Sequence, residues 1–166
     1  MNQSIASLVQ TLSNLLEKSS IKIALAESCT GGLLAAHLTA QAGSSLWFDR
    51  GFVTYSNAAK IESVGVSPSI IEQYGAVSEE VAKAMAQGAL NHSAAKTSIA
   101  ITGIAGPGGA TEYKPVGMVC FAWAVQFPGS PALLIASTQI FDGDRQAIRE
   151  QACAYALNEL IQILRK

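Results

Sequence analysis

The fold of this chain turns on the stretch LAESCTGG, residues 25–32, where an expected strand gives way to an expected helix. The apolar run from Ile21 to Ala26 predicts a strand covered on both faces. The apolar pattern from Leu33 to Leu38 has helical spacing. This order places small polar side chains at the carboxyl end of a sheet, where open α/β sheets build their sites. We expect the functional site here, with the free N–H groups of the new helix favouring an anion or an oxyanion.

Length and composition predict an apolar, lightly charged globular chain. The 166 residues suit one domain, residues 1–166, and the 49% hydrophobic and 14% charged residues argue against disorder. A formal net charge of -1 without a basic run argues against a nucleic-acid partner. We expect no membrane segment, because no apolar run reaches roughly 18 residues. The low charge favours a homo-oligomer, most simply a homodimer.

The three cysteines, Cys29, Cys120 and Cys153, are far apart and form no CxxC pair. This usage predicts a reducing cytoplasm rather than a disulfide framework. Residues 1–20 have the pattern of an amphipathic helix, not of a secretion signal. His, Cys and acidic residues do not cluster at metal-ligand spacing, so we expect no metal and no cofactor.

Helical and strand patterns alternate along the chain. Helices are expected at 1–20, 33–38, 56–65, 67–75, 78–90 and 144–164, and strands at 21–26, 51–55, 97–101, 116–125 and 132–141. Ser56, Ser78 and Asp144 have the positions of helix caps, and Gly65 and Gly75 those of helix ends. The last two strands are joined too briefly to be parallel. The order predicts a single three-layer α/β/α domain with a mixed, partly antiparallel sheet.

Ser28 is the candidate nucleophile, and a serine needs a base that takes its proton. His37 and His92 lie in or beside helical patterns rather than in glycine loops or at strand ends, which favours a structural role for both. Cys29 is the alternative nucleophile, because a thiol near a helix start is activated there.

Lys60 is the alternative base. If Ser56 caps the helix, Lys60 lies near its first turn, where the helix dipole disfavours a positive charge and lowers the pKa of the amine. A neutral amine accepts a proton, and Tyr55, just before the cap, could relay or share it. From position alone, a solvated lysine and a plain strand-end tyrosine remain the alternative interpretation.

The glycine-rich stretch TGIAGPGG, residues 102–109, is the second candidate element. Its glycines allow backbone N–H groups to approach a ligand, although it matches neither a Walker loop nor a dinucleotide fingerprint. It is typical of a phosphate cradle, an oxyanion hole or a flexible loop. Arg145 stands at a helix start, where a ligand phosphate or the neighbouring Asp144 would stabilise it. Arg50 is a weaker candidate of the same kind.

Several motifs, in this order, resemble the CinA C-terminal domain family. They are AESCTGG at 26–32, FDRGFVTYSNAAK at 48–60, GAVS at 75–78, TGIAGPGG at 102–109, KPVG at 114–117 and FDGDR at 141–145. The resemblance covers the chain from about Leu12 to Leu164. It departs from the family at Ala58, where a glutamate is expected in many relatives. Longer members carry an additional N-terminal domain, and we expect its activity to be absent here.

The stand-alone members of the family are PncC-type nicotinamide-nucleotide amidohydrolases. They convert nicotinamide mononucleotide (NMN) and water to nicotinate mononucleotide and ammonia in pyridine-nucleotide recycling, without a cofactor. The resemblance implies that Ser28 is the nucleophile and that Tyr55 and Lys60 activate it. The residues expected to contact the substrate are Thr30, Gly31, Asn57, Thr102, Gly103, Gly106 and Arg145.

Other functions stay open at this point. A non-catalytic nucleotide-binding module would share the glycine-rich turns without needing Ser28. A competence-related interaction module would need neither. An amidase for a different amide would share the chemistry but would not prefer a nucleotide.

Overall fold

Five strands form one mixed sheet in the order β2-β1-β3-β4-β5. The structure, a computed structural model, describes residues 3–166. The strands are β1 (Ile23–Glu27), β2 (Phe48–Val53), β3 (Thr97–Gly103), β4 (Met118–Val125) and β5 (Leu133–Ile140). The helices are α1 (Ile5–Ser19), α2 (Leu33–Thr39), α3 (Asn57–Val64), α4 (Pro68–Tyr74), α5 (Glu79–Asn91) and α6 (Arg145–Arg165), with a 3-10 turn, η1 (Ser44–Leu46).

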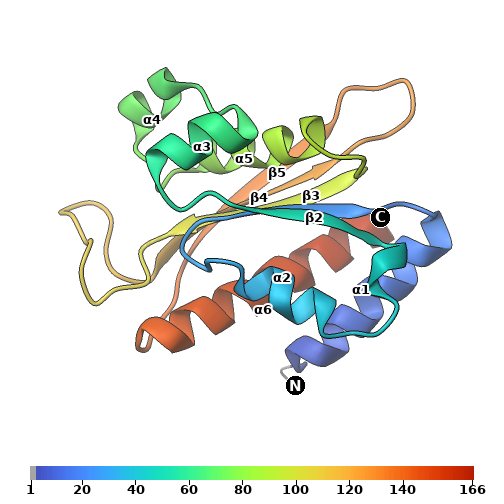
Figure 1. Ribbon diagram of the computed structural model, residues 1–166. Helices are drawn as coiled ribbons and strands as arrows, with labels where there is room; N and C mark the ends of the chain where they lie inside the picture. Colours follow the sequence, from blue (N-terminus) through green and yellow to red (C-terminus); the bar gives the residue numbers. More distant parts are fainter. Residues whose placement is uncertain (1–2) are drawn as a thin grey trace.

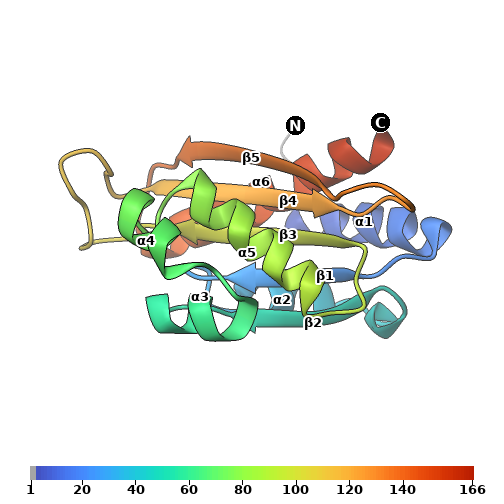
Figure 2. The ribbon, with the colours of Figure 1, turned by 90° about the horizontal axis from the view of Figure 1, so that it is seen from above.

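The sheet lies between two helical layers. Helices α3, α4 and α5 cover one face, and α1, α2 and α6 cover the other (Figure 1). β1 pairs in parallel with β2 and β3, whereas β4 pairs antiparallel with β3 and β5. Viewed from above, the carboxyl ends of β1, β2 and β3 meet at one edge, beside the start of α3 (Figure 2). The predicted single three-layer α/β/α domain with a mixed sheet is confirmed.

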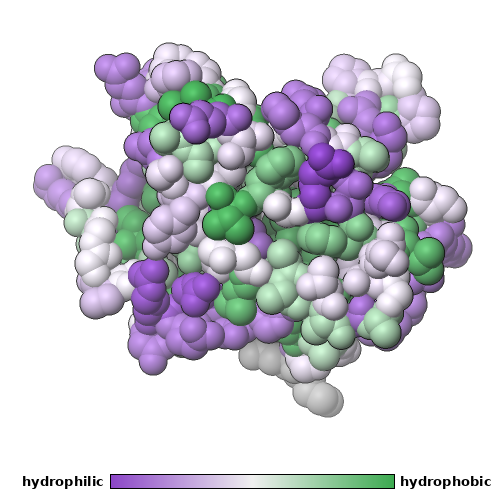
Figure 3. All heavy atoms as spheres, viewed as in Figure 1, coloured by the Kyte–Doolittle hydropathy of each residue, from purple (hydrophilic) through white to green (hydrophobic). Residues whose placement is uncertain are grey.

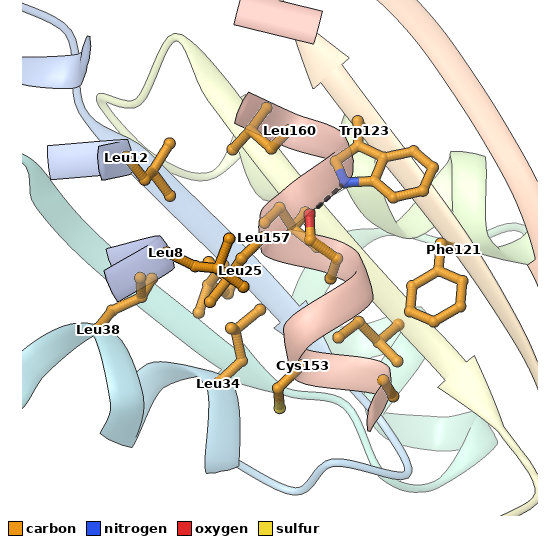
Figure 4. Packing of buried hydrophobic residues seen from close by; sticks show 14 of the residues in the cluster. Leu8, Leu12, Leu25, Leu34, Leu38, Phe121, Trp123, Cys153, Leu157 and Leu160 are labelled. Atoms are coloured by element: carbon orange, nitrogen blue, oxygen red, sulfur yellow. Dashed lines mark hydrogen bonds between the residues drawn. The ribbon is translucent and has the colours of Figure 1, made fainter. Parts of the chain in front are cut away.

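Side-chain alternation along the strands gives the two faces different cores. On the face of α1, α2 and α6, Leu25, Phe121 and Trp123 pack against leucines of the three helices (Figure 4). The Trp123 indole N–H donates to the carbonyl oxygen of Ala156 on α6 at 3.0 Å, so this large buried ring leaves no polar atom unpaired.

The other face is lined mainly by alanines and other small residues of β1, β3 and β4, so α5 packs closely on it. Gly88 of α5 in turn admits α3: a Cβ atom at this position would lie 1.9 Å from the carbonyl oxygen of Val64. This close contact fixes the end of α3, which is the helix that carries Lys60.

Helix caps follow the sequence prediction, and strand ends depart from it. Ser56 accepts from the Ala59 N–H, and Ser78 and Asp144 cap their helices in the same way. β2 covers Phe48–Val53 rather than 51–55. The Thr54 N–H still donates to the Glu27 carbonyl oxygen of β1 at 2.8 Å, and the strand ends there because the chain then turns into α3, which Ser56 caps.

Two other strands start later than predicted. β1 runs from Ile23 to Glu27 rather than 21–26, and β4 starts at Met118 rather than at residue 116. Gly117, with a φ of +93°, makes the turn into β4, and its Cβ would collide with the Phe141 carbonyl. The last residues before β4 therefore belong to a turn.

The face of the molecule seen in Figure 3 mixes residue types. Hydrophilic and hydrophobic residues are interspersed over the face seen in Figure 3, and hydrophilic side chains gather over the first turns of α6. Among residues 3–166, no helix is both long and apolar enough to cross a bilayer.

Candidate active site

The carboxyl edge of the parallel strands holds a cavity of about 260 Å³. Ser28 follows β1, Tyr55 follows β2, and Thr102 and Gly103 end β3, so the parallel pairing brings these segments together. The cavity is lined by Ser28, Cys29, Tyr55, Asn57, Lys60, Ala76, Val77, Thr102, Gly103, Ile104, Ala105, Gly106, Gly108, Gly109 and Arg145.

Ser28 and Lys60 form a direct pair at the base of the cavity. The Lys60 Nζ and Ser28 Oγ atoms are 3.0 Å apart, and the side chains come from segments 32 positions apart in sequence. Lys60 is 1% exposed and Ser28 is 8% exposed. Two backbone carbonyl oxygens also contact the amine, those of Thr54 at 2.9 Å and Tyr55 at 3.3 Å.

The surroundings of Lys60 favour its neutral form. Burial lowers the pKa of the amine, because the charged form loses its hydration. No carboxylate pairs with Lys60 among the described ion pairs. In the neutral amine, two N–H groups can donate to Thr54 and Tyr55, which leaves the lone pair to accept the proton of Ser28.

The other nucleophile and base considered from sequence are less suited. Burial raises the pKa of the Cys29 thiol to about 12, so it is protonated at neutral pH. His37 bonds to Glu150 at 2.9 Å, and the His92 ring bonds to the Gly88 carbonyl oxygen at 2.8 Å. Neither histidine lines the cavity.

The start of α2 is not a free anion site, and this expectation is wrong. The buried Glu27 carboxylate accepts from the Leu34 N–H at 2.9 Å and from the Ala35 N–H at 3.1 Å. These donors of the first turn are therefore already used. The sequence signal that could have revealed this contact is the acidic residue Glu27 ahead of α2, because the helix dipole favours a negative charge near the start of a helix.

Arg149 of α6 supports the Ser28 turn, and the sequence analysis missed it. Its Nε donates to the Cys29 carbonyl oxygen at 3.1 Å, and its Nη2 donates to the Thr30 carbonyl oxygen at 2.9 Å. These contacts span about 120 positions of sequence. An arginine on a long helix carries no local signal of such a role.

Tyr55 and Arg145 meet at the rim of the cavity. Arg145 donates from Nη1 to the Gly106 carbonyl oxygen at 2.7 Å and from Nη2 to the Tyr55 hydroxyl oxygen at 3.2 Å. The Tyr55 side chain is 58% exposed. Tyr55 thus reaches Lys60 and Ser28 with its backbone carbonyl oxygen, while its phenol lies beside Arg145.

The glycine-rich loop presents unpaired backbone donors. Within the described chain, the N–H groups of Ala105, Gly106, Gly108 and Gly109 donate no hydrogen bond. None of the described residues that line the cavity is acidic, whereas Arg145 brings a positive charge to it. Free N–H groups and a guanidinium around one cavity are suited to a phosphate or another anion.

The remaining predicted residues are placed as follows. Asn57 and Gly103 line the cavity, and Thr102 lines it while donating its hydroxyl to the Ala76 carbonyl oxygen at 2.8 Å. Thr30 and Gly31 do not line the cavity; they lie in the turn that follows Ser28 in the chain. Over residues 3–166, no group of three or more His, Cys, Asp or Glu side chains has a metal-binding arrangement.

Comparisons with known proteins agree with this architecture. The nicotinamide-nucleotide amidohydrolase PncC of Enterobacter agglomerans is 51% identical over 140 residues, which cover 84% of this chain and 83% of that protein. The protein of the same name in Escherichia coli K12 is also 51% identical, over 84% of this chain and 82% of its own length. A CinA-like protein of Mycolicibacterium paratuberculosis is 54% identical over 86% of this chain but over 33% of its own length.

Solved structures show the same fold. The competence/damage inducible protein of Agrobacterium tumefaciens is 40% identical with a TM-score of 0.89, and the match covers 100% of both chains. A CinA superfamily protein of Escherichia coli is 38% identical with a TM-score of 0.89, over 96% of this chain and 90% of that chain. The family model described as the CinA C-terminal domain matches residues 5–164. The chain belongs to the CinA C-terminal domain family.

Proposed function

We propose that this protein is an NMN amidohydrolase that uses Ser28 as nucleophile and Lys60 as its base. The observation that carries the proposal is the 3.0 Å contact, inside the cavity, between a serine hydroxyl and a buried amine that has no carboxylate partner among the described ion pairs. The substrate class comes from the two PncC relatives, whose printed name is nicotinamide-nucleotide amidohydrolase. The combination favours amide hydrolysis over ligand binding alone.

In the first step, Ser28 Oγ attacks the carboxamide carbon of NMN while Lys60 Nζ takes the hydroxyl proton. The carbonyl oxygens of Thr54 and Tyr55 hold the amine with its lone pair toward Ser28. Tyr55 thereby contributes to activation through its backbone. The proton passes from Lys60 to the leaving nitrogen, which departs as ammonia and leaves an acyl-enzyme.

In the second step, Lys60 takes a proton from a water molecule that attacks the acyl carbon. The bond to Ser28 Oγ breaks, and the serine recovers its proton from Lys60. The product is nicotinate mononucleotide. General-base catalysis of this kind contributes about a hundredfold to ten-thousandfold to the rate.

We assign the 5′-phosphate of NMN to Arg145 and the free N–H groups of the 104–109 loop. The Arg145 bond to Gly106 ties the guanidinium to that loop, so both donors face one anion together. The absence of acidic side chains from the described cavity lining removes a source of repulsion.

The first experiment measures ammonia release from NMN by the parent protein, Ser28→Ala and Ser13→Ala. Ser13 is a matched control, because it is also buried and hydrogen-bonded but lies on α1. We expect release by the parent and by Ser13→Ala, and none by Ser28→Ala. A folded parent that binds NMN without releasing ammonia would favour a nucleotide-binding module instead.

The second experiment tests the assignment of the phosphate. Arg145→Ala is expected to raise KM for NMN about tenfold or more, because a charge-assisted contact contributes roughly 1.5–3 kcal/mol. Nicotinamide riboside lacks the phosphate, so its kcat/KM should be unchanged by the same substitution. Equal losses for the two substrates would contradict the assignment.

A further inference from the structure

The Arg149 guanidinium holds the turn that follows the proposed nucleophile. We propose that Arg149 is a positioning residue, which holds the turn after Ser28 so that the Cys29 N–H serves as the oxyanion donor for acyl transfer at Ser28. The proposal rests on the proposed function in one respect, namely that Ser28 is the nucleophile. It does not depend on which amide is the substrate.

The orientation follows from the geometry of a trans peptide, in which C=O and N–H point in opposite directions. Arg149 binds the Cys29 carbonyl oxygen, so the Thr30 N–H points away from Arg149. The Ser28 carbonyl oxygen accepts from the Gly31 N–H at 3.0 Å, so the Cys29 N–H points away from the closed side of the turn. Within residues 3–166, neither of these two N–H groups donates to another residue.

The free Cys29 N–H lacks a partner although it is largely buried. Cys29 is 6% exposed and lines the cavity, whereas Thr30 is fully buried and does not line it, so a ligand oxygen can reach the Cys29 N–H but not the Thr30 N–H. Buried N–H groups are nearly always paired. The acceptor would be the oxygen that becomes negative when the neighbouring Ser28 attacks. Donors at this place, directly after a nucleophile in a strand-to-helix turn, are suited to that oxygen.

Most of the other donors around the turn are already used. The Ser28 N–H donates to the Ile101 carbonyl oxygen at 2.9 Å. The Leu34 and Ala35 N–H groups of α2 donate to Glu27. Glu27 and Arg149 therefore fix the turn by its donors and its acceptors respectively, and the Cys29 N–H stays available at the cavity.

The chemistry of arginine suits this role. Its planar fork binds two neighbouring carbonyl oxygens at once, which a lysine ammonium does with less geometric control.

The test uses p-nitrophenyl acetate, an acyl donor whose reaction passes through the same oxyanion without NMN. Ser28 Oγ forms a bond to the acetyl carbon, p-nitrophenolate leaves, and the hydroxyl proton goes to Lys60. The acetyl group on Ser28 is quantified by peptide mass spectrometry over time, in the parent, Arg149→Ala, Arg149→Lys and Gln151→Ala. Gln151, which also lies on α6, is the matched control, because its side chain donates to two carbonyl oxygens, those of Asp142 and Ala147.

We expect Arg149→Ala to acetylate Ser28 about ten- to a hundredfold more slowly than the parent, the loss typical of a weakened oxyanion donor. Arg149→Lys should be intermediate, and Gln151→Ala should match the parent. Guanidinium chloride at millimolar concentration should restore part of the rate to Arg149→Ala. The pH of half-maximal rate should not move, because it reports Lys60.

The outcomes separate this proposal from the proposed function. Acetylation of Ser28 at the parental rate in Arg149→Ala would overturn the positioning role, as would equal slowing by Gln151→Ala without rescue by guanidinium. If NMN is the substrate, Arg149→Ala should lower kcat and leave KM unchanged, whereas a raised KM alone would overturn the proposal. A parent that is acetylated at Ser28 but releases no ammonia from NMN would refute the substrate only. A parent that is never acetylated at Ser28 would refute both.

Discussion

Replacing Lys60 by methionine tests the centre of the proposed mechanism. Methionine has a similar length and no amine, so the buried volume is nearly kept while the contacts to Ser28, Thr54 and Tyr55 are lost. Loss of a general base typically lowers kcat about a hundredfold to ten-thousandfold. This corresponds to about 3 to 5 kcal/mol of activation free energy. Lys83→Met, at an exposed lysine of α5, is the control.

The same variant makes a prediction about stability and pH. The pKa of Lys60 is lowered in the folded protein from an ordinary value of 10.5. Between the folded and the unfolded pKa, the unfolded chain binds one more proton, so the stability of the parent rises with pH by up to about 1.4 kcal/mol per unit. Lys60→Met lacks this dependence and should gain stability relative to the parent as the pH falls from 10.5.

Both predictions are measured on one preparation. Initial rates of ammonia release give kcat at saturating NMN, and urea unfolding at several pH values between 7 and 10.5 gives the free energy of unfolding. Turnover within about tenfold of the parent would refute Lys60 as the base. A difference in stability that stays constant across this pH range would refute the lowered pKa.

Three further substitutions test the fold around the site. Gly88→Ala should destabilise the protein by about 3 kcal/mol in urea unfolding, because the new Cβ would lie 1.9 Å from the Val64 carbonyl oxygen, whereas Gly108→Ala has open space and should cost far less. Glu27→Gln should cost about 1 to 3 kcal/mol in the same assay, since the amide nitrogen that replaces one carboxylate oxygen cannot accept its N–H group of α2, and an unchanged midpoint would contradict this. Cys29→Ala should keep ammonia release within a few-fold of the parental rate. Cys29 in the folded parent should also resist iodoacetamide at neutral pH, because burial raises the pKa of its thiol to about 12. Rapid alkylation of Cys29 would contradict a buried, protonated thiol.

Local patterns in the sequence were sufficient for much of the fold. The continuous apolar run of β1 and the caps at Ser56, Ser78 and Asp144 depend on neighbours a few residues away, so sequence reveals them directly. Most predicted site residues also line one cavity, because the parallel pairing of β1 with β2 and β3 brings their carboxyl ends together.

Contacts between distant segments were not predictable in the same way. The bond between Arg149 and the Ser28 turn depends on how α6 crosses the sheet, and nothing near Arg149 in sequence encodes that crossing. The phenol of Tyr55 was expected beside Lys60 but lies with Arg145, because the chain leaves β2 at Thr54 and points the Tyr55 carbonyl oxygen toward the amine instead.

Lys60 shows how local and long-range effects can act in the same direction. Its place near the start of α3 opposes a positive charge through the helix dipole, which the sequence alone indicates once Ser56 is identified as the cap. Its burial under the turn after β1 opposes the charge again, and this becomes visible only in the folded chain. Because both effects favour the neutral amine and no carboxylate pairs with it among the described ion pairs, Lys60 is suited to accept a proton. A lysine that only binds an anion would need the opposite environment, in which exposure to solvent keeps the side chain charged. Arg145, at the rim of the cavity, is exposed in this way.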